Sequence, residues 1–225
     1  MDKIDVIIIG AGIAGVTTAY YLQKNFPNIS YKIIESRSSL GGTWDQMQFP
    51  GVRADNDMYT YGFSFNPWQG PIIGKGQHIK KYINDTAEKF NIKKHILFDT
   101  QVTSSSWKNN QWITKTSRKN FTSQYIICCT GSRDRKNPHL PKFKNENKYQ
   151  GKIVHTQAWG DTDYKNKNVT IIGSGCTAIT MAPSIIKEAK TVTLVQRSPA
   201  WIINIDSQEK SSRGYKTFEV LKDYI

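Results

Sequence analysis

The amino-acid sequence predicts an α/β protein built from two Rossmann-like dinucleotide-binding units. Glycine-rich turns follow apolar runs at residues 10–15 and again at residues 173–178. Each turn opens a segment with helical periodicity, and a second apolar run follows each of these segments. An apolar strand, a glycine turn, a helix and a second strand form the βαβ unit that binds nucleotides.

The first βαβ unit starts at residues 5–9, an apolar run typical of a parallel strand that is covered on both faces. Gly10, Gly12 and Gly15 follow in GxGxxG spacing. The first glycine allows a tight turn, the second lets the backbone approach a pyrophosphate, and the third lets the helix pack close to the strand. A helix over residues 13–25 would direct its N-terminal amides at the phosphates.

Glu35 ends the second predicted strand of this unit, residues 31–35. An acidic residue about twenty residues after the glycine turn accepts hydrogen bonds from ribose hydroxyls. The same carboxylate would repel a 2′-phosphate. The first unit is therefore expected to hold an adenosine diphosphate with a free ribose, as in FAD or NAD.

A long segment without strand alternation follows, with Leu40-Gly-Gly-Thr-Trp44, Phe49-Pro-Gly-Val-Arg-Ala-Asp55 and several aromatic residues up to Trp68. Loops of this length are usually functional or disordered, and the aromatic density argues against disorder. We expect a wall of a flavin or substrate site. Packing of the aromatic residues in a satellite core is an equally open alternative.

The following segment is expected to form an amphipathic helix over residues 77–90 and then a small antiparallel β insertion. The insertion is predicted from strands over residues 96–98, 102–108 and 111–117, the last two joined by an Asn-Asn turn. Residues 125–129 are predicted to return as a buried parallel strand. The basic residues 133–143, with two prolines, predict a linker.

The second βαβ unit is expected from a strand over residues 168–172, the turn Gly173, Gly175 and Ala178, and a helix to about residue 187. A strand over residues 191–196 then ends in Gln196-Arg197-Ser198, where the first unit had its acid. Arginine binds a 2′-phosphate through charge-assisted hydrogen bonds, so this unit is expected to hold NADP(H). The predicted domains are 1–142, which binds FAD, and 143–225, the start of an incomplete NADP-binding domain.

Composition limits the other function classes. The net charge is +13, with 31 Lys+Arg against 18 Asp+Glu, but the lysines are scattered and no arginine-rich helix appears. A solvated lysine surface is therefore expected, and nucleic-acid binding is not. No apolar run is long enough to cross a bilayer. Cys128, Cys129 and Cys176 have neither metal-binding spacing nor a disulfide pattern, and we expect core thiols of a cytoplasmic protein.

The connector between the units, residues 149–159, carries the sharpest motif. Gly151, His155 and Trp159 resemble the F-x-G-x-x-x-H-x-x-x-W fingerprint of the Baeyer–Villiger monooxygenases in the flavin-containing monooxygenase superfamily. Tyr149 replaces the Phe, and Gly160 stands where Pro or Asp is usual. Similarity to the family extends over nearly the whole chain, through Gly41-Gly-Thr-Trp-Asp45, Pro50-Gly-Val-Arg-Ala-Asp55, Asp57-Met-Tyr-Thr60 and Gln196-Arg-Ser-Pro199.

The resemblance implies three groups of site residues and no metal. The positions that contact FAD are Gly10, Gly12, Ala14, Gly15, Glu35, Thr43, Trp44, Asp45, Gln46 and Val102. The loop beside the flavin and the nicotinamide contains Arg53, Ala54 and Asp55. The NADP site contains Gly173, Ser174, Gly175, Cys176, Thr177, Ala178, Ile179, Gln196 and Arg197. Asp55 and Arg53 are the implied catalytic residues, and His155 is implied to couple domain movement to catalysis.

By the same resemblance the chain is expected to act in an FAD- and NADPH-dependent monooxygenase. Such an enzyme inserts one oxygen atom of O₂ into a small-molecule ketone, giving an ester or lactone, or into a sulfur centre of a thioether, through a C4a-peroxyflavin. Family members are longer and carry a catalytic arginine beyond residue 225. The open alternatives are an N- or S-oxygenating flavin enzyme and a catalytically inactive nucleotide-binding fragment. A disulfide reductase would need a Cys-x-x-Cys pair, which this sequence lacks. Oligomeric state is left open.

Overall fold

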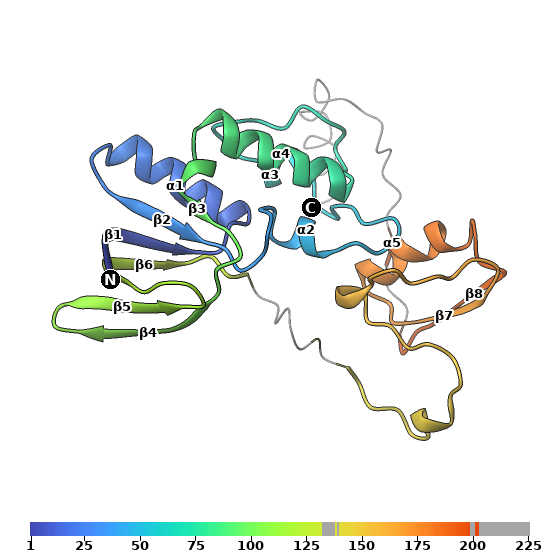
Figure 1. Ribbon diagram of the computed structural model, residues 1–225. Coiled ribbons are helices and arrows are strands. Elements are labelled where there is room, and N and C mark those ends of the chain that lie inside the picture. Colours follow the sequence, from blue (N-terminus) through green and yellow to red (C-terminus); the bar gives the residue numbers. More distant parts are fainter. Residues whose placement is uncertain (132–137, 139, 199–200, 203–225) are drawn as a thin grey trace. The chain divides into compact units, whose positions relative to one another are not determined.

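The computed structural model describes residues 1–131, 138, 140–198 and 201–202 (Figure 1). The predicted linker falls partly outside these residues, as does Pro199. By its contacts the chain forms two compact units. Unit 1 comprises Met1–Gln46 with Gln77–Ser132, and unit 2 comprises Met47–Gly76 with Arg133–Ile225. The sequence predicted a single division after residue 142, whereas here residues 47–76 group with the C-terminal half.

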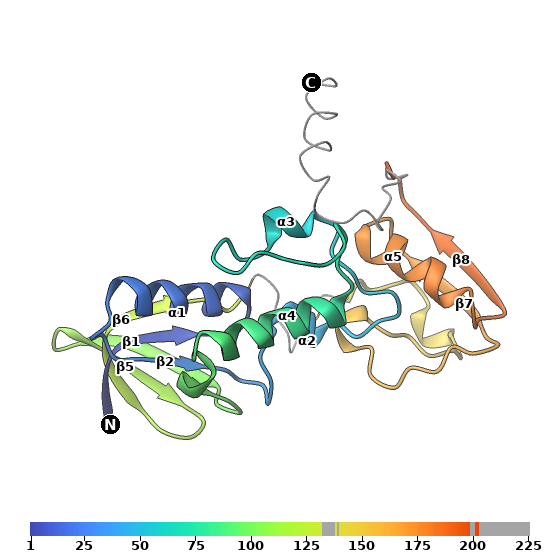
Figure 2. The same ribbon diagram turned by 90° about the horizontal axis from the view of Figure 1, so that it is seen from above.

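Unit 1 contains a six-stranded sheet in the order β3-β2-β1-β6-β5-β4. Its strands are β1 (Asp2–Ile9), β2 (Tyr31–Ile34), β3 (Ile96–Leu97), β4 (Val102–Lys108), β5 (Gln111–Thr116) and β6 (Phe121–Cys128). The first three and β6 run parallel, and β4 and β5 form an antiparallel extension. Figures 1 and 2 show α1 (Ile13–Asn25) lying on one face of this sheet.

The central strand of unit 1 is β1, as its apolar run predicted. Val6, Ile7 and Ile8 are all buried, and β1 pairs with β2 on one side and with β6 on the other. Ile7 packs with Ile34 and Phe121 in one cluster. The carboxyl ends of β1, β2 and β6 lie at the same edge of the sheet, which is where an open α/β sheet binds its ligand.

The antiparallel insertion differs from the predicted one. Residues 96–98 were expected to belong to it, but β3 pairs in parallel with β2 as an edge strand of the main sheet. The third antiparallel strand is instead the first part of β6, which pairs with β5. The strand begins at residue 121 and not at residue 125 because the buried Phe121 ring anchors it in the core. The Asn-Asn turn is confirmed, since Asn109 and Asn110 both have positive φ.

Unit 1 is completed by two further helices. Helix α4 (Gly76–Lys89) carries the amphipathic pattern that the sequence predicted, with Ile79, Ile83 and Ala87 buried. The short helix α2 (Thr43–Gln46) follows two positive-φ glycines, Gly41 and Gly42. A 3₁₀ turn, η1 (Lys93–His95), leads into β3.

Unit 2 is built on two parallel strands, β7 (Asn168–Ile172) and β8 (Thr191–Val195). Helix α5 (Cys176–Ile185) connects them and contains Pro183. The remaining short elements are α3 (Met58–Tyr61), η2 (Glu146–Lys148) and η3 (Thr156–Ala158). The core of the unit is formed by Met47, Phe49, Ile171, Ala178, Met181 and Ile185.

Residues 47–76 join unit 2 for a physical reason. Met47 and Phe49 are buried against the apolar face of α5, and the segment closes on itself through backbone hydrogen bonds. The amide of Ala54 donates to the carbonyl of Gly74 (2.8 Å), and the amide of Gly76 donates to the carbonyl of Val52 (2.9 Å). The segment is therefore an ordered loop with its own buried side chains, as its aromatic content predicted.

Two findings concern the whole described part of the chain. None of its helices combines the length and the apolar character needed to span a membrane. The prediction of three core thiols is wrong, because Cys128 and Cys176 are exposed and Cys129 is half-buried. Cys128 is the last residue of β6, and Cys176 is the first residue of α5, so both lie at element ends rather than within the core.

Candidate dinucleotide-binding sites

The glycine turn of unit 1 is held between two strand ends. The amide of Gly10 donates to the carbonyl of Ile34 (2.9 Å), the last residue of β2. Gly10 has a φ of +105°, and a Cβ on it would overlap the carbonyl oxygen of Cys129 just beyond β6. A Cβ on Gly15 would overlap the carbonyl oxygen of Gly10. The first glycine therefore allows the tight turn beside the end of β6, and the third lets α1 pack close to the strand, as the motif predicted.

Gly12 differs from Gly10 and Gly15, because a Cβ on Gly12 would not clash with the protein. A Cβ there would meet only Gly42, with its nearest atom, the Gly42 Cα, at an ordinary contact distance of 3.5 Å. Gly12 is also the N-cap of α1, and no side-chain oxygen caps its first turn. The N-terminal amides of a 13-residue helix, with the helix dipole behind them, thus remain for an anionic group.

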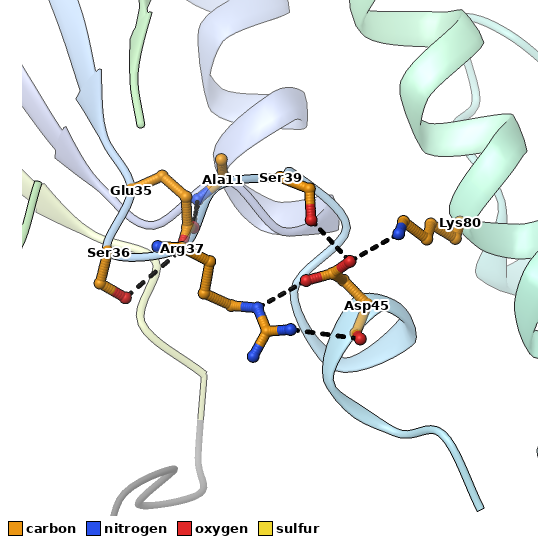
Figure 3. A network of polar contacts seen from close by, with 7 residues as sticks. All are labelled: Ala11, Glu35, Ser36, Arg37, Ser39, Asp45 and Lys80. Carbon is orange, nitrogen blue, oxygen red and sulfur yellow. Dashed lines mark hydrogen bonds and ion pairs between the residues drawn. The ribbon is translucent and has the colours of Figure 1, made fainter. Parts of the chain in front are cut away.

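Glu35 lies directly after β2 with 1% of its surface exposed. One carboxylate oxygen accepts from the amide of Ala11 (2.8 Å) in the glycine turn. The other accepts from the amide of Arg37 (2.9 Å). These bonds, drawn in Figure 3, fix the carboxylate at the turn. Carboxylate oxygens accept hydrogen bonds from hydroxyl groups, which is the role that the sequence predicted for Glu35 toward a ribose.

Asp45 forms a second polar centre beside Glu35, and it is 4% exposed. Its Oδ2 pairs with Nε of Arg37 (2.5 Å), and its Oδ1 accepts from Nζ of Lys80 (2.6 Å) and from the hydroxyl of Ser39 (2.7 Å). Burial acts to raise the pKa of Asp45, but the hydrogen bonds from Lys80, Ser39 and Arg37 together lower it below its ordinary value of 3.8. The carboxylate therefore stays ionised inside unit 1 (Figure 3).

The other predicted FAD positions surround the same strand ends. Thr43, Trp44 and Gln46 lie with Asp45 on α2, and the amide of Gly41 ties this turn to the carbonyl of Ala11 (3.0 Å). Val102 begins β4. The residues before it lie beside the Glu35 loop, because the amide of Thr100 donates to the carbonyl of Glu35 (2.9 Å). Ala14 is exposed on the first turn of α1.

The glycine turn of unit 2 repeats the geometry of the first. The amide of Gly173 donates to the carbonyl of Val195 (2.9 Å), as that of Gly10 does to the last residue of β2. Gln196 is therefore the counterpart of Glu35, and an uncharged amide takes the place of the carboxylate. Arg197 follows it, exposed, and makes no ion pair with any residue that the structure describes. Ser174 to Ile179 form the turn and the start of α5.

The loop with Arg53, Ala54 and Asp55 belongs to unit 2 and contacts the start of α5. Ala54 is buried, whereas Arg53 and Asp55 are exposed. The carboxylate of Asp55 forms a hydrogen bond with the thiol of Cys176. Gly51 packs against α5, with a φ of +81° and no space for a Cβ beside Thr180 and Ser184. The structure thus brings the predicted catalytic loop to the second glycine turn.

This contact predicts the reactivity of Cys176. The hydrogen bond to Asp55, together with partial desolvation of the thiol and the negative charge of Asp55, raises the pKa of the thiol above its ordinary value of 9.0. The thiolate is the reactive form, so the exposed Cys176 should be alkylated slowly by iodoacetamide at pH 8. Asp55→Asn should lower this pKa and speed alkylation several-fold, measured by peptide mass spectrometry. Cys128 is the internal control, and an equal acceleration at both cysteines would contradict the assignment.

His155 lies in the connector that carries the fingerprint. Its Nδ1 accepts from the amide of Gln157 (3.2 Å), which caps η3. A cavity of about 670 Å³ is lined by His155, Trp159, Gly173 and Thr177, together with β7 residues. The fingerprint histidine and the second glycine turn therefore share one cavity within unit 2. Among the described residues no cluster of three His, Cys, Asp or Glu side chains is arranged to hold a metal.

Sequence reasoning missed the partners of Asp45. Arg37 stands two residues after Glu35, and this short spacing was a usable signal for a charged group near the ribose. Lys80 gave no such signal, because it lies on α4, far along the sequence. Ser39 gave none either, since a hydroxyl in a serine-rich turn is common. Gly51 was quoted as part of a motif, but its packing on α5 depends on tertiary structure.

Comparison with known proteins identifies a family whose model matches the chain, and proteins with similar sequences. The family model described as pyridine nucleotide-disulphide oxidoreductase matches residues 4–212. The FAD-containing monooxygenase EthA of Mycobacterium tuberculosis is 40% identical over 212 residues, which are 90% of this chain and 43% of that protein. The chain therefore spans less than half the length of the curated relatives it matches.

Several solved structures resemble the chain at 26% identity, including the following two. The crystal structure of OTEMO in complex with FAD and NADP has a TM-score of 0.75 and covers 88% of this chain and 39% of its own. Oxidized steroid monooxygenase bound to NADP has a TM-score of 0.80, with 99% and 44% covered. These matches confirm the predicted α/β Rossmann-type fold and the resemblance to flavin monooxygenases.

Proposed function

Because this chain belongs to the pyridine nucleotide-disulphide oxidoreductase family, we propose that unit 1 binds FAD and unit 2 binds NADP(H). We further propose that the two units serve a flavin-dependent monooxygenase. The observation that carries this proposal is the paired geometry of the two glycine turns. Both are bonded to the end of a neighbouring strand, but one strand is followed by Glu35 and the other by Gln196 and Arg197.

Unit 1 fits the adenosine diphosphate part of FAD. The uncapped first turn of α1 supplies amides for a pyrophosphate, and Gly12 leaves room for its approach. Glu35 is held by two backbone amides in the position from which an acid accepts ribose hydroxyls. Its negative charge disfavours a 2′-phosphate, which favours FAD over NADP at this unit.

Unit 2 fits NADP(H) for the opposite reason. Gln196 takes the place of the acid and does not repel a 2′-phosphate, and the exposed guanidinium of Arg197 attracts one. The N-cap of helix α5 is Gly175, which provides no side-chain cap, so the first amides of the helix are available to a pyrophosphate as those of α1 are. The relative EthA is named as FAD-containing, and the OTEMO complex holds both FAD and NADP, in agreement with this assignment.

The cofactors supply the redox chemistry: NADPH provides a hydride, and reduced FAD delivers one atom of O₂ to the substrate. The chain contributes binding, orientation and charge. Arg53 and Asp55 are proposed to act beside the reacting groups, and the contact of Asp55 with Cys176 orients their loop on unit 2. His155, in the cavity with the second glycine turn, is proposed to link cofactor binding to movement of unit 2.

The proposed reaction is Baeyer–Villiger oxidation, in which a ketone, O₂, NADPH and a proton give an ester or lactone, NADP⁺ and water. Oxygen transfer to a thioether is the second outcome open to the same cofactors. The connector motif with Gly151, His155 and Trp159 favours the first. A mixture of a ketone and a thioether, with FAD and NADPH, separates the two by their products. Binding of both cofactors without any product would favour a nucleotide-binding role alone.

The cofactor assignment has a direct test in Arg197. Substitution Arg197→Ala should weaken NADPH binding about tenfold or more, because charge-assisted bonds to the 2′-phosphate are lost. NADH binding should change little, and FAD binding should be retained. Isothermal titration with NADPH, NADH and FAD measures all three. An equal loss for NADPH and NADH would exclude Arg197 from 2′-phosphate recognition.

A further inference from the structure

Each unit carries an arginine near the strand end at which a ribose is proposed to bind, but the two arginines differ in their contacts. Arg197 follows Gln196 and has no acidic partner among the residues described. Arg37 lies two residues after Glu35, and its own amide donates to the Glu35 carboxylate. In NADP-binding units an arginine in this neighbourhood donates hydrogen bonds to the 2′-phosphate. Unit 1 thus contains, in Arg37, a side chain able to bind a 2′-phosphate, close to Glu35, the acid proposed to bind the ribose.

In the structure this arginine is directed to Asp45. Its Nε donates to Oδ2 of Asp45 (2.5 Å), and a terminal nitrogen donates to the backbone carbonyl of Asp45 (3.3 Å). Figure 3 shows the side chain of Arg37 extending from the Glu35 loop to Asp45 on α2. The side chain of Arg37 is only 34% exposed, which strengthens a charged pair relative to one in open solvent.

Contacts other than the one with Arg37 hold the Asp45 side chain in place. Its second oxygen is occupied by Lys80 and by Ser39, so Oδ2 is oriented toward the guanidinium. The turn that carries it is tied to the glycine loop by the Gly41 amide. The acceptor is therefore fixed to the same framework that binds the nucleotide.

We propose that Asp45 is a specificity-determining residue of unit 1, which withdraws Arg37 from the ribose and thereby excludes 2′-phosphorylated nucleotides. This inference rests on the proposed binding of FAD by unit 1. Glu35 excludes the 2′-phosphate by repulsion, and Asp45 does so by removing the cation that would offset that repulsion. Asp45 itself needs no contact with the cofactor.

The test compares two nucleotides as competitors for FAD. The full chain carrying Arg197→Ala, which lowers 2′-phosphate affinity in unit 2, is the parent protein. FAD is bound and monitored by flavin fluorescence, and 5′-ADP or 2′,5′-ADP is added to displace it. The ratio of their inhibition constants measures how strongly unit 1 prefers one competitor over the other. In the parent protein 5′-ADP should displace FAD at a lower concentration than 2′,5′-ADP does.

Asp45→Asn should shift this ratio about tenfold toward 2′,5′-ADP, because a released guanidinium gains charge-assisted bonds to the 2′-phosphate. Arg37→Met added to Asp45→Asn should return the ratio to the parent value. Lys80→Met is the matched control: it removes the other cation on Asp45, leaves Arg37 paired, and should not shift the ratio. An unchanged ratio in Asp45→Asn that still binds FAD would overturn the inference.

Arg37→Met alone gives a second test that does not depend on the folding of Asp45→Asn. The paired Arg37 contributes nothing to 2′-phosphate binding, so this variant should keep the parent ratio. A loss of 2′,5′-ADP binding in Arg37→Met would mean that the guanidinium already serves the nucleotide, and would overturn the inference. A parent protein that binds neither FAD nor 5′-ADP would instead contradict the proposed function on which the inference rests.

Discussion

Gly15→Ala should destabilise unit 1 by about 3 kcal/mol and remove FAD binding with it. The added Cβ would overlap the carbonyl oxygen of Gly10 and lie 3.1 Å from its carbonyl carbon. Neither is the end of a flexible side chain, because both belong to the backbone of the glycine turn. Relief requires α1 to move away from β1, and that movement opens the buried contacts of Val16 and Ala19. Thermal denaturation and FAD titration measure the two losses.

Gly12→Ala is the matched control in the same motif. Its Cβ would meet Gly42 at 3.5 Å, which is ordinary contact, and the backbone φ of −82° suits alanine. The free energy of unfolding should therefore change by less than about 1 kcal/mol. FAD affinity should nevertheless fall about tenfold or more, because the methyl group occupies the space through which the pyrophosphate approaches the backbone. Equal melting temperatures for Gly12→Ala and Gly15→Ala would contradict this separation of roles.

The first βαβ unit could be predicted closely from the sequence, because local signals agree there. The apolar run of β1, the three glycines and the acid after β2 each specify one part of the same motif, and helix α1 has the bounds expected for it. The second glycine turn was predicted on the same grounds. The equivalence of Glu35 and Gln196 then follows from the matching hydrogen bonds of Gly10 and Gly173.

Other features could not be predicted because they depend on contacts between distant segments. Two residues, Ile96 and Leu97, are too short a run to indicate whether they pair in parallel or antiparallel, and the choice is made by the free edge of β2. The grouping of residues 47–76 with unit 2 depends on how Met47 and Phe49 pack against α5. The Arg37–Asp45–Lys80 network needs three separate segments to meet.

The network around Asp45 also changes the interpretation of a predicted site residue. The family resemblance counted Asp45 among positions that contact FAD. In the structure its carboxylate is buried and accepts from Arg37, Ser39 and Lys80. A role in holding the binding loop and directing Arg37 accounts for these contacts.

Gly51→Ala should have the second largest effect, and it acts on the loop with Arg53 and Asp55. The residue has a φ of +81°, and a Cβ would lie 2.7 Å from the carbonyl oxygen of Thr180 and overlap the hydroxyl of Ser184. The cost combines left-handed backbone strain with a clash against α5, about 3 kcal/mol together. Because the clash separates the loop from α5, the contact between Asp55 and Cys176 should also be lost.

Gly160→Ala isolates the backbone part of that cost. Gly160 lies in the same unit with a φ of +53°, and a Cβ there meets no atom within 4 Å. Gly160→Ala should cost only about 1 kcal/mol, from left-handed strain alone.

Adding Ser184→Ala to Gly51→Ala should restore only part of the stability that Gly51→Ala loses, because the Thr180 carbonyl remains in the way. Thermal melts rank the variants, and faster alkylation of Cys176 in Gly51→Ala, but not in Gly160→Ala, would report displacement of the Asp55 loop. If both glycine variants melt alike and leave Cys176 unchanged, α5 does not hold this loop.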